Sequence, residues 1–179
     1  MTALAQLLIL GLGNPLCGDD GAGVAAVTRL RARYRAPAGV IVLDGGTLGL
    51  SLLPHLQLAR RAILVDAVST GDPPGTLVRI EGDDVAHAAA HKLSPHQVGV
   101  ADLLDGALLS GRRPDPMVLL GVVPAQIELG TRRSPDVQAR IDALVEAVVD
   151  EARCMGFAMA DLGAARNEED AHAARLLGL

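Results

Sequence analysis

The stretch LLILGLGNPLCGDDGAGV, residues 7–24, decides how the rest of the sequence is interpreted. Its apolar start, residues 7–10, is typical of a buried strand, and residues 22–33 have the apolar spacing of a helix. Four glycines lie between these two elements, at positions 11, 13, 18 and 21. A strand, a glycine-rich turn and a helix in this order often bind a phosphate, because free N–H groups and the helix dipole attract anions.

The details of this turn argue against a nucleotide. Leu16 stands where the dinucleotide-binding pattern G-x-G-x-x-G needs its third glycine. Asp19 and Asp20 replace the lysine and the hydroxyl residue of a P-loop. A carboxylate repels a phosphate at close range and attracts a cation. A nucleotide-binding α/β protein is therefore a minor hypothesis, and the turn favours a positively charged guest.

Apolar runs and helical segments alternate along most of the chain, which predicts an α/β protein. We expect a three-layer α/β/α sandwich with a mostly parallel, mixed and twisted sheet of about five strands. Only about ten residues separate the third and fourth strands, too few for a crossover helix, so we expect these two to be antiparallel. The expected strands are 7–10, 40–43, 62–65, 76–80 and 117–122, and the expected helices are 22–33, 48–58, 83–90, one starting at Ser94 and one over 134–152.

Length and composition set the class of protein. The 179 residues suit one domain, which we place at 1–156, followed by a helical or disordered tail at 157–179. A single Phe, a single Tyr and no Trp predict an aliphatic core, and the net charge of −5 argues against nucleic acid. No apolar run has the length of a membrane span and the N-terminus lacks a basic region, so we expect a cytoplasmic protein that does not bind membranes.

Acidic residues follow each of the first three expected strands. Asp20 follows the first strand, Asp44 ends the second and Asp66 ends the third, while His96 lies near the start of a later helix. Because parallel strands end at the same edge of a sheet, these side chains are expected on one rim. The pattern favours a cation site or a carboxylate-based catalytic site, and the alternative is ordinary turn chemistry.

Two carboxylates and one imidazole form a donor set of intermediate hardness. Such a set suits nickel, zinc, cobalt or manganese better than an all-oxygen calcium site or a thiolate zinc site. Three protein ligands leave coordination positions for water or for a partner molecule. The residues alone do not choose among these metals.

Five segments of the sequence occur in order between about residues 7 and 155: GLGNPLCGDDGAG, LDGGTLGL, LVDAV, SPHQVGVADLL and LLGVVPAQIELG. Together they resemble the hydrogenase maturation proteases, the endopeptidases that finish the large subunit of nickel–iron hydrogenases. The tail beyond about residue 157 does not contribute to this resemblance.

The resemblance implies a nickel site made by Asp20, Asp66 and His96. Some members of the family have Glu at the position of Asp20, which leaves Asp19 as an alternative ligand. The resemblance also makes Asp44 a candidate for peptide binding or catalysis. In that family the nickel is held by cysteines of the unprocessed subunit, so the substrate carries the metal. Zinc or cadmium could substitute for it in a crystal.

The expected function is removal of a C-terminal peptide from the nickel-loaded large-subunit precursor of a nickel–iron hydrogenase. Either the metal activates the scissile carbonyl or water, or one of the acids Asp20, Asp44 and Asp66 acts as the base. No other cofactor is expected, and the chain is expected to be a monomer. The alternative function is a checkpoint or chaperone that binds the same precursor without cleaving it.

Overall fold

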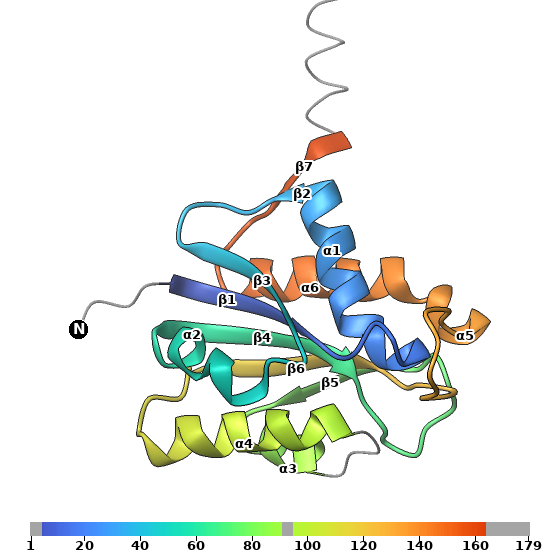
Figure 1. The fold of residues 1–179 in the computed structure, drawn as a ribbon. Helices are drawn as coiled ribbons and strands as arrows, with labels where there is room; N and C mark the ends of the chain where they lie inside the picture. Colours follow the sequence, from blue (N-terminus) through green and yellow to red (C-terminus); the bar gives the residue numbers. More distant parts are fainter. Residues whose placement is uncertain (1–4, 91–94, 164–179) are drawn as a thin grey trace, which may run out of the picture.

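The computed structural model describes residues 5–90 and 95–163, and it places side chains in these ranges except at 89, 90 and 95–99. Five strands form the main sheet, in the spatial order β3, β1, β4, β6, β5 (Figure 1). The first four are parallel to one another and β5 is antiparallel to β6. The strands are β1 (Ala5–Leu12), β3 (Val40–Gly46), β4 (Ala59–Ala67), β5 (Leu77–Glu81) and β6 (Met117–Val122). The expected mixed α/β sheet is confirmed.

Helices cover both faces of this sheet, which confirms the expected three layers (Figure 1). On one face α1 (Ala22–Arg33) and α6 (Ile141–Cys154) pack against the side chains of Leu7 and Ile9. On the other face the 3₁₀ turn η2 (Gly49–Leu52) and three helices pack against Leu8 and Leu10. These three helices are α2 (Leu53–Gln57), α3 (Asp84–Ala90) and α4 (Pro95–Leu109). Alternate residues of β1 therefore pack into two separate aliphatic cores, one on each face of the sheet.

Two expected helices are divided in the structure. The predicted helix 48–58 is the turn η2 followed by α2, because Pro54 in the first turn of α2 has no N–H to continue a preceding helix. The predicted helix 134–152 is α5 (Pro135–Gln138) and then α6. Its expected cap is present, since the Ser134 hydroxyl accepts the N–H of Val137 at 3.3 Å. The break follows a tight turn in which the N–H of Arg140 bonds to the carbonyl of Val137.

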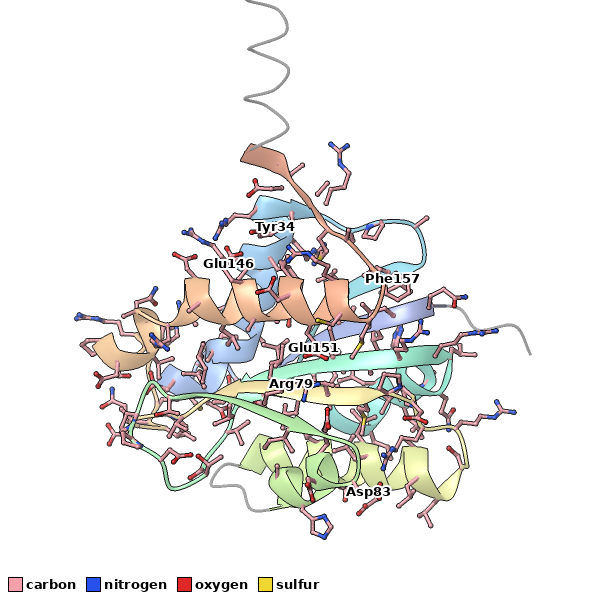
Figure 2. The ribbon with its side chains drawn as sticks, turned by 180° about the vertical axis from the view of Figure 1, so that it is seen from behind. Tyr34, Arg79, Asp83, Glu146, Glu151 and Phe157 are labelled. Atoms are coloured by element: carbon pink, nitrogen blue, oxygen red, sulfur yellow. The ribbon has the colours of Figure 1, made fainter. Side chains whose placement is uncertain are left out.

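The antiparallel orientation expected for the fourth strand is confirmed, but its partner differs. β5 pairs with β6 and not with β4, because β6 returns to lie beside β4 and leaves β5 at the edge of the sheet. Arg79 on β5 forms a forked ion pair with Glu151 on α6, at 2.7 and 3.1 Å, and the two residues face each other in Figure 2. This pair fastens the edge strand to the helix that covers it.

A second, two-stranded sheet was not expected from the sequence. β2 (Tyr34–Arg35) pairs antiparallel with β7 (Ala160–Asp161), so the chain just after residue 157 returns to the end of α1. Strands of two residues show no alternation that a pattern could reveal. The rest of the predicted tail, from residue 164, lies outside the described residues. Among the helices within the described ranges, none combines the length and the apolar character needed to cross a membrane.

Candidate metal and catalytic site

The turn between β1 and α1 sits directly against the carboxyl end of the sheet. A Cβ on Gly23, in the first turn of α1, would overlap the backbone carbonyls of Leu12 and Val65. A Cβ on Gly13 would overlap the carbonyl oxygen of Asp20 and lie 3.6 Å from Oδ1 of Asp66. Glycine is therefore required at both positions. Asp20 and Asp66, which the sequence places 46 residues apart, border the same glycine.

Asp20 lies in a 3₁₀ turn, η1 (Gly18–Gly21), and is completely buried. Its Oδ2 accepts the backbone N–H of Asn14 at 2.9 Å. The side chain of Asn14 in turn accepts the N–H of Leu16 at 3.0 Å, which closes a small turn. The carboxylate of Asp20 thus has a fixed direction, because the turn that holds it is itself hydrogen-bonded.

Asp66 is the last acid of β4 and is also completely buried. Its Oδ1 accepts the N–H of Ala67 at 2.8 Å. Alternation along the strand places its side chain on the same face as those of Leu64 and Val68, which belong to the core under α2, α3 and α4. A buried carboxylate is costly unless it is hydrogen-bonded or paired with a positive charge. The hydrogen bonds to Asp20 and Asp66 offset part of this cost, and both carboxylates lie at the carboxyl edge of the sheet.

His96 is the second residue of α4, and its side chain lies outside what the structure describes. Helix α4 begins on the side of the molecule toward which the carboxyl end of β4 points (Figure 1). It also covers the sheet face on which the side chain of Asp66 lies. Helix α4, which carries the predicted ligand His96, therefore begins at the same edge of the sheet as Asp66.

Asp44 is separated from these two acids. It is exposed, and its Oδ1 accepts the N–H of Gly46 at 3.0 Å, an ordinary turn at the end of β3. In the register of the sheet Asp44 lies opposite Gly11, and Gly11 lies opposite Val65. Asp44 therefore points to the α1 and α6 face, and Asp66 to the other face. Among the side chains that the structure describes, no three His, Cys, Asp or Glu residues gather closely enough to hold a metal.

Asp19 has a role that the sequence analysis missed. Its carboxylate is completely buried and accepts three backbone N–H groups from the loop between β6 and α5. Oδ1 accepts from Ser134 at 2.6 Å, and Oδ2 accepts from Ala125 at 2.9 Å and Gln126 at 3.1 Å. The two neighbouring acids of the turn thus have different partners: Asp19 binds this loop, and Asp20 binds the turn at Asn14. The signal for this role in the sequence was the presence of two adjacent acids in one tight turn, because their side chains must point in different directions and so meet different partners.

Comparison with known proteins decides the family. A family model described as hydrogenase maturation protease matches residues 24–151. This chain belongs to the hydrogenase maturation protease family. The matched range contains Asp44, Asp66 and His96, and it begins just after Asp20.

Relatives and solved structures agree with this family membership. The chain is 43% identical over 154 residues to the hydrogenase expression/formation protein HupD of Rhodobacter capsulatus, covering 85% of this chain and 73% of that one. It is 37% identical over 152 residues to the hydrogenase 2 maturation protease of Escherichia coli, covering 84% and 93%. The structure of the hydrogenase maturating endopeptidase HybD from E. coli superimposes with a TM-score of 0.84 at 34% identity, covering 88% of this chain and 98% of that one. The family therefore supports a protease on this α/β fold.

Proposed function

We propose that this protein removes a C-terminal peptide from the nickel-loaded large-subunit precursor of a nickel–iron hydrogenase. The observation that carries the proposal is that Gly13 adjoins both the backbone carbonyl of Asp20 and the carboxylate of Asp66, two buried acids at the carboxyl edge of a hydrogenase maturation protease fold. Such carboxylates suit a divalent cation. The family supplies the class of substrate, and the two acids supply the chemistry.

In this proposal the nickel ion belongs to the substrate. Asp20 and Asp66 bind it together with His96, while the precursor holds its remaining ligands. The carboxylates also distinguish a loaded precursor from an empty one, because only a loaded precursor brings a positive charge to the two acids. Binding of the metal and selection of the substrate are then the same event.

The hydrolytic step has two possible routes, and both use these acids. In one route the bound metal polarises the scissile carbonyl or activates water. In the other, a carboxylate accepts the proton of the attacking water while the metal only positions the peptide. Asp44 is exposed at the same edge of the sheet but points to the opposite face, so we assign it a role in binding the peptide or as a base on that side.

The decisive experiment incubates the purified protein with nickel-loaded precursor and follows the precursor by mass spectrometry. We expect a fixed loss of mass at the C-terminus and no loss from nickel-free precursor. An Asp150→Asn variant serves as the control, because that acid lies exposed near the end of α6, where it pairs with Arg153. A stable complex with the full-length precursor would instead favour the non-cleaving checkpoint. Absence of both cleavage and binding would reject the proposal.

Metal binding is tested separately from cleavage. Titration of the protein with zinc or cadmium is expected to show one site that is weakened in the Asp66→Asn variant and retained in Asp44→Asn. Equal binding by all three proteins would remove Asp66 from the ligand set. The monomeric state and cytoplasmic location expected from the sequence stay predictions, and gel filtration tests the first of them.

A further inference from the structure

The loop between β6 and α5, residues 123–134, is fastened more firmly than its exposure suggests, and we refer to it as the latched loop. Three of its N–H groups bond to the buried carboxylate of Asp19. At its start, the N–H of Val123 bonds to the carbonyl of Thr76 at 2.9 Å. In its middle, Gly130 exchanges two hydrogen bonds with the chain around Cys17. A loop held along its whole length presents its side chains in a fixed place.

This fastening brings the backbones of two exposed leucines close together. The N–H of Gly130 bonds to the carbonyl of Leu16 at 2.8 Å, and the N–H of Gly18 bonds to the carbonyl of Gly130 at 2.7 Å. These bonds form an isolated parallel bridge between Cys17 and Gly130, next to Leu16 on one segment and Leu129 on the other. Leu16 is 59% exposed and Leu129 is 91% exposed. Exposed apolar side chains that gather on neighbouring segments are typical of a binding surface.

The same contacts join this leucine pair to the candidate site. Asn14 accepts the N–H of Leu16 and donates its own N–H to the carboxylate of Asp20. Asp19, the neighbour of Asp20, holds the latched loop that carries Leu129. Leu16 is thus linked to Asp20 through Asn14, and the loop that carries Leu129 is linked to the same turn through Asp19.

We infer that Leu16 and Leu129 form the docking surface for an apolar stretch of the precursor polypeptide, and that Asp19 is a positioning residue that holds this surface beside Asp20. The inference rests on the proposed function, which requires a protein substrate to reach the buried acids. A peptide segment entering this edge of the sheet passes the turn and the latched loop, and apolar side chains are the partners that two exposed leucines prefer.

The first test compares two leucines of equal exposure at opposite ends of the molecule. Leu129 is 91% exposed at the carboxyl edge of the sheet, and Leu109 is 88% exposed at the end of α4. Leu129→Asp is expected to weaken binding of the nickel-loaded precursor by about tenfold or more, since burial of one leucine accounts for that much affinity. Leu109→Asp is expected to leave binding unchanged. Equal effects of the two substitutions, or no effect of Leu129→Asp, would overturn the inference.

The second test separates positioning by Asp19 from simple stabilisation. Asp19→Asn removes the charge that three N–H groups share, so the latched loop loses its fixed place. We expect KM for the precursor to rise about tenfold while kcat changes less, because the acids that cleave are untouched. A purely structural role would lower kcat through a smaller active fraction and leave KM unchanged, and that result would overturn the positioning role.

A double variant tests whether the two residues act through one surface. In the Asp19→Asn background, Leu129→Asp is expected to weaken binding by much less than it does alone, because the loop is already displaced. Full additivity would contradict the coupling. If the protein binds the precursor without cleaving it, and Leu129→Asp weakens that binding, the proposed protease function is rejected and the docking surface is kept. If the protein cleaves the precursor and Leu129→Asp has no effect on cleavage, the docking surface is rejected and the protease function is kept.

Discussion

The acids at the carboxyl edge of the sheet differ in kind from the acids on the α6 face. On α6, Asp142, Glu146 and Glu151 each meet an arginine: Arg29, Arg33 and Arg79 respectively. The Asp142 and Glu146 pairs are partly exposed, and in Figure 2 Glu146 lies beside Tyr34 while Glu151 lies on the side of α6 that faces Arg79. At the edge, Asp19, Asp20 and Asp66 are completely buried and accept backbone N–H groups.

The difference shows how one molecule uses carboxylates for two purposes. A guanidinium neutralises an acid and ties two elements together, but exposed pairs of this kind contribute little stability. Backbone N–H groups fix the direction of a carboxylate through charge-assisted hydrogen bonds. The edge therefore holds buried carboxylates in set directions, whereas the α6 face joins carboxylates to arginines.

The largest effect is expected from removing charge at the edge. Asp20→Asn and Asp66→Asn should each reduce precursor processing by about a thousandfold, because both routes need a charged carboxylate there. Asp150→Asn, near the end of α6, should process at the normal rate. The measurement is the initial rate of C-terminal cleavage by variants whose circular dichroism matches that of the wild type. Normal processing by either edge variant would erase the functional difference between the two regions.

The next effect concerns stability. Asp19→Ala leaves the buried N–H of Ser134 and the half-buried N–H groups of Ala125 and Gln126 without their acceptor, and it should lower the free energy of unfolding by about 3 kcal/mol. Asp142→Ala removes an acid that is 59% exposed and should cost less than about 0.5 kcal/mol. Urea denaturation measures both. Similar costs would show that backbone-held and arginine-paired acids contribute alike.

A smaller effect is expected within the α6 face. Arg79 makes the forked pair with Glu151, whose side chain is only 12% exposed, and these hydrogen bonds raise the pKa of Arg79. Arg79→Ala should therefore cost about 1 kcal/mol, and Arg79→Lys part of that, since lysine cannot form the fork. Arg29→Ala, at an exposed pair, should cost less than about 0.5 kcal/mol. Thermal unfolding of the three variants ranks them.

The smallest effect is a dependence on alkaline pH. Burial raises the pKa of Tyr34, and its hydrogen bond to Glu146 adds to the rise. Because the unfolded chain loses this proton first, the free energy of unfolding should stay level below about pH 10 and fall as the pH rises through the raised pKa. Tyr34 is the only tyrosine, so ultraviolet absorbance reports its ionisation directly. Tyr34→Phe should remove this slope.

Much of the fold could be predicted because long apolar runs decide it. Helix 22–33 and strand 117–122 have the same limits in the sequence prediction and in the structure. The predictions were wrong where a local event overrode the periodicity. Pro54 starts a new helix after a 3₁₀ turn, and the helix after Ser134 is broken at Arg140. β5 was placed in the right direction, but the return of β6 set its neighbour.

The candidate site was predictable only in part. Asp20 and Asp66 follow from the rule that parallel strands end at one edge, and they border one glycine in the structure. The same rule grouped Asp44 with them, because it does not record the face of the sheet to which a strand-end residue points. The latched loop was invisible to pattern, since Asp19 binds residues more than a hundred positions away.

Asn14 has a mechanical consequence. The backbone N–H of Asn14 bonds to the carboxylate of Asp20, and its side-chain oxygen accepts the N–H of Leu16, which closes the turn that carries this leucine. The direction of the Asp20 carboxylate and the bend that carries Leu16 therefore depend on the same residue. In the proposed docking, a precursor that contacts Leu16 touches the turn that orients the acid.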